Sequence, residues 1–375
     1  MIIRPVAMSD LAALKDIAVE SGPGFTSLVN NHDFLVRKIE RSIASFASST
    51  QQPGDQGYLF VLVEPETGHI MGTTGIEASV GAHRPIYHYR VGRTIHQSSA
   101  LSHRQQTLTL CRHYTGCTEI CTLFLRQAYR RAWAGKLLSR VRFLFMAQHP
   151  KRFAGTVIAE MRGVSDQAGN SPFWHSLQAH FVDLDFATVS QMVGTGGNGF
   201  IADLMPERPI DTRDLDDAAR SVISEVHPDT RPALHMLQSE GFRYTGFVDP
   251  LDGGPTVEAQ LQNLASVRQS SHCRVVIQPD AAPSSGPWTN GGQGKTLMVA
   301  NNKTADFRAT VTSAARYLPA QNLLEVPESL ATSLGLENDA KVWFADLEAG
   351  RNQGQNPVLA AKRPLTTVKE SLSAH

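Results

Sequence analysis

The sequence has few cysteines, no excess of charge of either sign and no long apolar run. Its four cysteines, Cys111, Cys117, Cys121 and Cys273, form no CxxC pair, and a chain of 375 residues can build a core without cross-links. They therefore predict free thiols in a reducing compartment, which favours the cytoplasm. Lys plus Arg and Asp plus Glu both total 35. This balance lacks the basic footprint of a nucleic-acid-binding protein, so we expect no nucleic-acid partner.

The chain also lacks the marks of a membrane or exported protein. No stretch approaches the roughly 18 uninterrupted apolar residues of a membrane span, so we expect no membrane partner. The opening residues 1–18 have no basic start, no long apolar segment and no small-residue cleavage site, which argues against a signal peptide. At about 100–200 residues per domain, the length predicts two or three domains.

Strand and helix signals alternate over the first 260 residues. Apolar residues recur at helical spacing in some windows, and short branched or apolar runs flank turn residues in others. The alternation predicts a mixed α/β (α+β) fold. The predicted elements are strands over 2–6, 58–63, 70–78, 118–126, 156–161 and 200–206, and helices over 10–19, 33–47, 135–148, 171–180, 215–225 and 231–240.

The composition changes after residue 260. Residues 281–294 are rich in Pro, Ser and Gly, so we interpret 261–295 as a linker or loop. Beyond the linker, residues 296–350 read as short strands around a small helix over 328–334, which predicts a compact β-barrel-like appendage. The last residues, 351–375, form a polar tail that we expect to fray.

The most informative segment runs from Leu123 to Gly135. An apolar strand ends there, an arginine-containing turn follows, and a helix begins at a glycine. Such a helix start presents unpaired N–H groups and a positive dipole end, which suit a pyrophosphate. We therefore expect Arg130, Arg131, Ala132 and Gly135 to bind phosphate, with the arginines adding charge-assisted contacts. The alternative is an ordinary strand–turn–helix with surface arginines.

This segment resembles the pyrophosphate loop of GNAT-type acyl-CoA N-acyltransferases, with Arg130 first and Gly135 last. Trp133 stands where many of those enzymes carry a second glycine. Two further stretches resemble the first strand and helix and the closing helix and turn of that superfamily: Ile3-Arg4-Pro5 with Ser9-Asp10-Leu11, and Ala233-Leu234 through Glu240-Gly241-Phe242. The resemblance implies a mixed central sheet flanked by helices.

A finer resemblance is to the arginine N-succinyltransferase family, in register over about residues 1–260. It implies transfer of a succinyl group from succinyl-CoA, as co-substrate, to the α-amine of L-arginine. This is the first step of arginine catabolism by the succinyltransferase pathway, and related subunits imply a homo- or hetero-oligomer. The stretches that carry the resemblance are Gly22-x-Gly24-x-Thr26-x-Leu28, Tyr89-Arg90-Val91-Gly92, Leu123-Phe124-Leu125, Ala159-Glu160-Met161-Arg162-Gly163 with Ser165-Asp166, Ser171-Pro172-Phe173-Trp174, Phe200-Ile201-Ala202-x-Leu204-Met205-Pro206 and Val226-His227-Pro228-Asp229-Thr230.

The same resemblance assigns His227 as proton donor and Leu125 to succinyl-CoA binding. His227 lies just before a predicted helix, with Asp229 or Thr230 available as N-cap, and imidazole titrates near neutrality. The alternative is a histidine that only satisfies a turn. Leu125 is expected to act through its backbone, because free N–H and C=O groups at a strand end can pair with pantetheine or polarise the thioester.

Four charged residues in the matching stretches are candidates for substrate binding. Arg90 and Arg162 are candidates for the succinyl carboxylate, since a guanidinium fork matches a carboxylate. Glu160 or Asp166 is a candidate partner of the substrate guanidinium. For each of the four, a structural ion pair is the alternative interpretation.

Two glycine-containing motifs resemble nucleotide-binding loops but lack part of the required pattern. Gly194-Thr195-Gly196-Gly197-Asn198-Gly199 fits G-x-G-x-x-G, but an apparent strand rather than a helix follows it. Gly294-Lys295-Thr296 lacks the first glycine of a phosphate loop. We therefore expect no nucleotide cofactor, and no cluster has metal-ligand spacing, so we expect no metal. Succinylation of ornithine or another amine, use of a different acyl-CoA, and a catalytically silent partner subunit stay open as alternatives.

Overall fold

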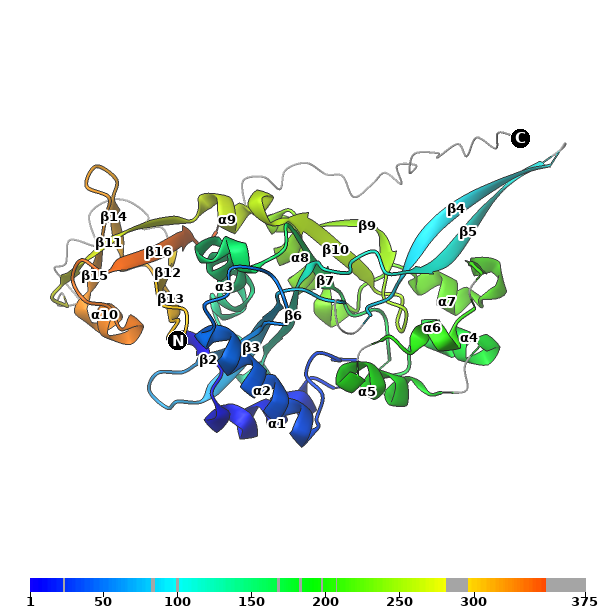
Figure 1. Ribbon diagram of the computed structural model, residues 1–375, viewed down its shortest axis with the longest axis horizontal. Coiled ribbons are helices and arrows are strands. Elements are labelled where there is room, and N and C mark those ends of the chain that lie inside the picture. Colours follow the sequence, from blue (N-terminus) through cyan, green and yellow to red (C-terminus); the bar gives the residue numbers. More distant parts are fainter. Residues whose placement is uncertain are drawn as a thin grey trace.

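The computed structural model describes residues 1–22, 24–81, 85–98, 101–166, 169–181, 184–196, 198–206, 208–280 and 296–348. Within these residues sixteen strands form one continuous sheet, and helices cover both faces of its central part (Figure 1). The mixed central sheet flanked by helices, predicted from the sequence, is confirmed.

In the described part of the chain, ten strands and nine α-helices precede the C-terminal strands. The strands are β1 (Ile2–Pro5), β2 (Gly57–Val63), β3 (Ile70–Glu77), β4 (His88–Ser98), β5 (Leu101–Cys111), β6 (Thr118–Leu125), β7 (Thr156–Glu160), β8 (Ile210–Asp211), β9 (Arg243–Val248) and β10 (Pro255–Gln260). The helices are α1 (Leu11–Glu20), α2 (His32–Ala47), α3 (Ala134–Gln148), α4 (Pro172–Phe181), α5 (Phe186–Gly196), α6 (Ile201–Leu204), α7 (Asp217–Val222), α8 (Arg231–Glu240) and α9 (Ala265–Gln269).

Strand β2 shows how the two faces of the sheet are filled. Successive side chains of a strand point to opposite faces. Accordingly Tyr58 and Phe60 join the core cluster that contains α3, whereas Leu59 and Val61 join the cluster that contains α1 and α2. Because β2 is apolar at both sets of positions, it is buried on both faces and lies in the middle of the fold.

The sheet contains one parallel pair in its central part, β6 with β7. Its order there is β1-β2-β3-β6-β7-β10-β9-β4-β5-β8, and the other neighbours are antiparallel. Only Thr118 and Glu119 of β6 pair with β7. The edge of β6 that faces β7 is therefore unpaired beyond Glu119. A register shift between β3 and β6, with Thr122 at a φ of 54°, bends β6 at that point.

Several predicted elements agree with the structure and one is wrong. The predicted helices over 135–148 and 231–240 are α3 and α8, and α8 ends at Gly241 in the left-handed conformation. Residues 200–206 were expected to form a strand, but 201–204 form the helix α6. The run is too short and too uniformly apolar for its periodicity to separate strand from helix. Gly194 and Gly196 lie in α5, which excludes a strand-to-helix nucleotide loop there.

The C-terminal strands extend the central sheet instead of forming a separate barrel. They are β11 (Ser271–Gln278), β12 (Leu297–Asn301), β13 (Ala309–Thr312), β14 (Arg316–Leu318), β15 (Leu323–Pro327) and β16 (Lys341–Asp346), with helix α10 (Glu328–Leu334). Their order, β14-β15-β11-β16-β12-β13, continues into β1 through Ile3 opposite Ala309. The predicted barrel-like closure is therefore not found in the part of the chain described: β14 is an open edge, and β13 pairs with β1.

The predicted linker over 261–295 is ordered in its first part. Residues 261–280 hold a short 3-10 turn, α9 and β11, and β11 pairs with β15 and β16. The side chains of Cys273 and Val275 in this strand are buried in the C-terminal core. Their burial explains why the strand forms although the residue before Cys273 and the residue between the two are polar. Residues 281–295 and the predicted tail over 351–375 lie outside the described residues.

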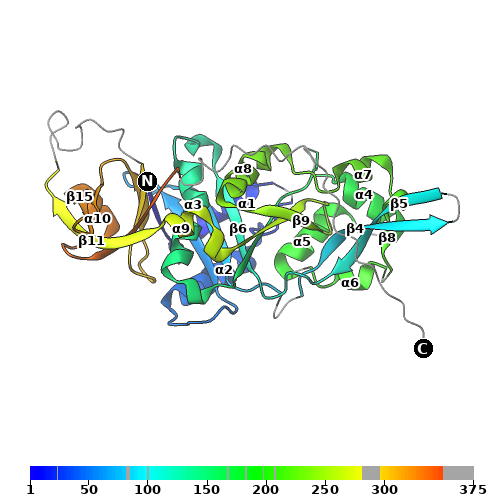
Figure 2. The same ribbon diagram turned by 90° about the horizontal axis from the view of Figure 1, so that it is seen from above.

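The two ends of the molecule differ in form (Figures 1 and 2). The C-terminal strands lie at one end. At the other end β4 and β5 form a hairpin whose eleven residue pairs run from His88 opposite Cys111 to Ser98 opposite Leu101, and its tip projects from the body. Among the described residues, no helix has the length and apolar character needed to span a bilayer.

Candidate active site

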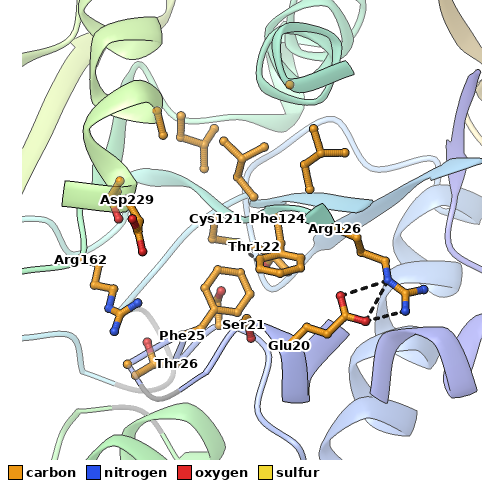
Figure 3. A pocket seen from close by; sticks show the side chains of 18 of the residues that line it. Glu20, Ser21, Phe25, Thr26, Cys121, Thr122, Phe124, Arg126, Arg162 and Asp229 are labelled. Carbon is orange, nitrogen blue, oxygen red and sulfur yellow. Dashed lines mark hydrogen bonds and ion pairs between the residues drawn. The ribbon is translucent and has the colours of Figure 1, made fainter. Parts of the chain in front are cut away.

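A cavity of about 1490 Å³ lies beside the unpaired edge of β6. Its walls come from β6 and the loop after it, the loop after α1, the end of β7, the start of α8 and the turn after β9. Figure 3 shows Arg162 and Asp229 on one side and the Arg126–Glu20 ion pair on the other, with Phe25 and Phe124 between them. The cavity thus occupies the place where a parallel pair of strands stops pairing.

The start of α3 borders this cavity and has the properties of an anion site. The N–H groups of Gly135 and Lys136 have no backbone acceptor among the described residues, so their partial positive charge is available. A Cβ atom added at Gly135 would meet nothing nearer than the Leu125 side chain at 3.9 Å. Arg130 lines the cavity as well and has no ion-pair partner among the described residues. The backbone N–H groups at the helix start and the Arg130 guanidinium are therefore both available to bind a phosphate.

Not every residue of the predicted phosphate loop faces the cavity. Arg131 makes an ion pair with Glu64 at 3.2 Å, and neither Arg131 nor Ala132 lines the cavity. Trp133 is the N-cap of α3 with a φ of 68°, a left-handed conformation that is uncommon for a residue other than glycine. Leu125 does line the cavity, and its side chain also packs against the main core cluster.

Arg162 lies across the cavity from α3, in contact with the glycine loop after α1. Its Nη2 donates to Ser165 Oγ at 2.9 Å, and its buried Nε has no acceptor among the described residues. Gly24 approaches this guanidinium so closely that a Cβ atom there would lie 3.3 Å from Nε, and its φ of 84° also favours glycine. The glycine therefore lets the loop close over Arg162, which keeps donor capacity for an anion.

Four carboxylates, Glu119, Glu160, Asp249 and Asp252, form an acidic cluster in the same cavity wall. Burial, together with the charges of Glu160 and Asp249, raises the pKa of Glu119 to about 8, against the opposing charge of Lys38. Burial and Asp252 raise the pKa of Asp249 well above its usual range, and burial raises the pKa of Asp252 to about 6. Like charges held together in a cavity favour a bound cation.

The fold positions these carboxylates by neutral hydrogen bonds rather than by ion pairs with Lys or Arg. Asp249 Oδ1 accepts from the N–H of Leu251 at 2.7 Å, and Asp252 Oδ2 accepts from the N–H of Gly163 at 2.7 Å. Glu160 Oε1 lies 2.8 Å from Nε2 of the buried His88. Glu119 has no hydrogen bond or ion pair with a described residue. The cluster therefore keeps acceptor capacity for a ligand.

His227 lies at the rim of the cavity rather than in its wall. Its neighbours Pro228 and Asp229 line the cavity, whereas His227 does not, and its side chain is 13% exposed. Nδ1 accepts a hydrogen bond from the Asp229 N–H at 3.2 Å, which caps the following 3-10 turn. Burial and the nearby charge of Arg162 lower the pKa of the imidazole, against the opposing charge of Asp229.

The remaining two predicted substrate residues lie away from the cavity. Arg90 is exposed on β4 and does not line it. Asp166 accepts from the backbone N–H and the side-chain amide of Asn170, both at 2.8 Å, and so stabilises its own loop. The structure thus brings together Leu125, Arg130, Gly135, Glu160 and Arg162 around one cavity, and it leaves Arg90 and Asp166 outside it.

Among the charged residues that line the cavity, sequence reasoning did not single out Glu119, Arg142, Asp249 and Asp252. Two signals were available. Glu119 is a charged residue near the start of an otherwise apolar strand, and Arg142 interrupts a helix that reads as apolar on its buried face. Asp249 and Asp252 look like ordinary turn residues in the sequence. In the structure described, no group of three or more His, Cys, Asp or Glu side chains could hold a metal ion; the absence of a metal stays a prediction.

Comparison with known proteins agrees with this geometry. The model of the family described as arginine N-succinyltransferase beta subunit matches residues 1–266. A protein of Yersinia pseudotuberculosis serotype O:3 (strain YPIII) called arginine N-succinyltransferase is 42% identical over 357 residues, covering 93% of this chain and 98% of its own length. A protein of the same name from Salmonella typhi is 42% identical over 315 residues, or 84% of this chain and 89% of its own length.

A solved structure gives the same assignment. Subunit AI of the arginine/ornithine succinyltransferase of Pseudomonas aeruginosa superposes with a TM-score of 0.82 at 30% sequence identity, and the match covers 92% of this chain and 98% of that one. The match extends well beyond residue 266, so the C-terminal strands are part of the shared structure. The chain therefore belongs to the arginine N-succinyltransferase family and is an acyltransferase.

Proposed function

We propose that the protein transfers the succinyl group of succinyl-CoA to the α-amine of L-arginine, giving N2-succinyl-L-arginine and free CoA. The observation that carries the proposal is the division of one cavity into an anion-binding helix start and an acidic cluster. The anionic phosphates of the donor fit the start of α3, near Gly135 and Arg130. The guanidinium of the acceptor fits the carboxylates of the acidic cluster, among them Glu160.

In this proposal the reaction is a direct transfer. The pantetheine arm lies along the unpaired edge of β6, where backbone groups near Leu125 bind it and polarise the thioester carbonyl. The neutral α-amine attacks that carbonyl carbon, a C–N bond forms, and the C–S bond breaks to release the thiolate of CoA. The amine loses one proton and the thiolate gains one. Holding both reactants in one cavity supplies much of the rate.

His227 is proposed as the group that delivers the proton to the thiolate. Its lowered pKa keeps the ring neutral near pH 7. Because Nδ1 accepts the Asp229 N–H, the proton of the neutral ring is on Nε2. The ring takes a second proton from the attacking amine, and the resulting imidazolium then donates one proton to the thiolate. Its position at the cavity rim is compatible with transfer through one water molecule. Arg162, which lies close to the acidic cluster, is proposed to bind a substrate carboxylate.

A thiol-release assay with three substrate pairs tests the proposal. We expect succinyl-CoA with arginine to react fastest, ahead of succinyl-CoA with ornithine and of acetyl-CoA with arginine. Faster release with ornithine would support the second candidate amine, which the name of the Pseudomonas relative includes. No release with any pair from folded protein would contradict the proposed activity and favour a silent subunit.

Two wider statements belong to the same proposal. The free state of all four cysteines suits a reducing compartment, and we propose that the enzyme acts in the cytoplasm. We also propose that it assembles with copies of itself or with a related subunit, because the matching family is described as a beta subunit. Light scattering of the purified chain, alone and with such a subunit, measures this directly.

A further inference from the structure

Helix α3 carries two buried arginines, and they differ in their ion-pair partners. Arg140 is 4% exposed and Arg142 is 2% exposed. Arg140 Nε lies 3.0 Å from Oε1 of the buried Glu240, so its charge is neutralised within the fold. Arg142 has no carboxylate within ion-pair distance among the described residues. It donates to Ser139 of its own helix, from Nε to the carbonyl oxygen at 3.0 Å and from Nη2 to Oγ at 3.4 Å.

A buried cation without a counter-charge is an unusual feature that calls for a physical reason. Desolvation of a charged group costs several kcal/mol unless a partner compensates it. The nearby ring of Phe143, 5.7 Å from the guanidinium carbon, offers only a weak cation–π contact. Burial lowers the pKa of Arg142 to about 10, against the charges of Cys121 and Glu240. The group still stays charged at neutral pH, and so the site favours an anion.

Arg142 faces the cavity, where an anion can reach it. It lines the same wall as Cys121 and Thr122, at the bend of β6, and as Met236 and Leu237 of α8. Its Nη1 atom donates to no described residue, and unlike Nε of Arg162 it is not sealed from the cavity. The guanidinium edge that carries Nη1 is therefore available to a ligand in the cavity that Arg142 lines.

The position of Arg142 along α3 indicates which anion it meets. It lies seven residues beyond Gly135, about 10 Å along the helix at 1.5 Å per residue, too far for a phosphate bound at the helix start. The acyl end of a CoA thioester lies at the far end of the pantetheine arm. In a succinyl group the carboxylate carbon is three C–C bonds from the thioester carbon, about 4 Å at bond lengths near 1.5 Å. A thioester at the bend of β6 thus brings its carboxylate close to Arg142.

We propose that Arg142 binds the terminal carboxylate of the acyl group and so selects a dicarboxylic acyl donor over a neutral one. The inference rests on the proposed function. The α-carboxylate of the amino acid is the other anion of the reaction. Arg162 is better placed for it, because Arg162 contacts the glycine loop and lies near Asp252 of the acidic cluster. The apolar side chains beside Arg142 then contact the methylene groups of the acyl chain.

The test compares succinyl-CoA with butyryl-CoA, which has the same chain length and no carboxylate. In the wild-type protein we expect kcat/KM to favour succinyl-CoA, and Arg142→Gln should reduce that preference at least ~100-fold, mostly through loss of activity with succinyl-CoA. Arg142→Lys should recover only part of it, because a point charge does not bind a carboxylate bidentately. An unchanged preference in Arg142→Gln would overturn the inference.

Two controls separate this result from misfolding and from failure of the proposed function. The dissociation constant of free CoA should stay within about threefold of wild type in Arg142→Gln, since free CoA lacks the carboxylate. Arg162→Gln should raise KM for arginine and leave the succinyl-to-butyryl preference within about threefold; a large change of preference there instead of in Arg142→Gln would contradict the assignment. Calorimetric binding of the two acyl-CoAs tests Arg142 even if no amine is a substrate.

Discussion

The start of α3 and the acidic cluster lie in one cavity but create their charge in opposite ways. At α3 the positive character comes largely from unpaired backbone N–H groups, and the arginine that lines the cavity there, Arg130, is exposed. In the acidic cluster the ionisable groups are carboxyl side chains, and burial and neighbouring carboxylates raise the pKa values of Glu119, Asp249 and Asp252. The first site costs the folded protein little free energy when no ligand is bound. In the second site, ionised carboxylates repel one another unless a cation is bound.

The difference predicts how substrates are sorted. A CoA thioester, with its anionic phosphates, is attracted to α3 and repelled by the acidic cluster, while a guanidinium compound shows the reverse preference. The reacting groups then meet between the two, near the bend of β6. Substitutions at each site should affect one substrate and leave the other nearly unchanged, and the following experiments test that separation.

The largest effect is expected at His227, between the two sites. His227→Ala should lower kcat at least ~100-fold if the imidazole moves a proton. His227→Asn is the matched variant, because an amide oxygen can accept the Asp229 N–H as a cap but cannot shuttle a proton. Both variants should be equally slow in a stopped assay of product formation. Recovery of turnover in His227→Asn would assign the residue to turn stabilisation alone.

The next largest effect is expected in the affinity for a guanidinium compound, which should depend on pH through the acidic cluster. Because the pKa of Glu119 is about 8, the carboxyl is mostly protonated at pH 7 and ionised at pH 9. A guanidinium binds the ionised form, so affinity should rise with pH, by about tenfold over this interval. Calorimetry with N2-acetyl-L-arginine measures this without a titrating amine. The rise should disappear in Glu119→Gln, and succinyl-CoA affinity should show no such rise in either protein.

A smaller effect concerns stability. The pKa of Asp249 is raised on folding, so its ionisation destabilises the folded state, and this loss grows as pH rises. Asp249→Asn keeps an oxygen to accept the N–H groups of Leu251 and Asp252 and removes the charge. We expect its Tm at pH 8 to exceed that of wild type by roughly 2–4 °C, about 1 kcal/mol, at the expense of arginine affinity. The difference should shrink at pH 5; a lower Tm at both pH values would contradict strain in the cluster.

The smallest effect is expected at the start of α3. Arg130 lines the cavity, whereas Arg131 is paired with Glu64 outside it. Arg130→Met should weaken CoA binding about three- to fivefold, as for an exposed charge–phosphate contact, and Arg131→Met should change it less than twofold. Fluorescence titration with CoA at low salt measures both. Equal losses in the two variants would mean that the loop rearranges when CoA binds.

The same contrast explains how much of the site could be read from the sequence. The α3 site is local: strand, turn and helix start lie within residues 123–136, so the sequence alone was enough to suggest a phosphate site there. The acidic cluster joins residue 119 of β6, residue 160 of β7, and residues 249 and 252 of the turn after β9. Glu160 was recognised only through the family resemblance. Asp249 and Asp252 are indistinguishable in sequence from ordinary turn carboxylates until the fold brings them together.

The fold shows a similar limit. Elements with clear periodicity or a cap signal were predicted well, such as the strands over 58–63 and 70–78, which pair as β2 and β3, and the helix over 231–240 that ends at Gly241. The β4–β5 hairpin was missed because its strands carry many polar residues and depend on their pairing with each other and with β9. Strand β11 was assigned to a linker for the same reason: its pairing partners, β15 and β16, lie 45 residues or more further along the chain.

The central claim is that the acidic cluster recognises the positive charge of the amine substrate. The most direct measurement is the ratio of kcat/KM for L-arginine to that for L-citrulline, its neutral analogue, with succinyl-CoA as donor in wild type and in Glu119→Gln. We expect a strong preference for arginine in the wild-type protein and at least a ~10-fold smaller ratio in the variant. An equal ratio in the two proteins would contradict the claim.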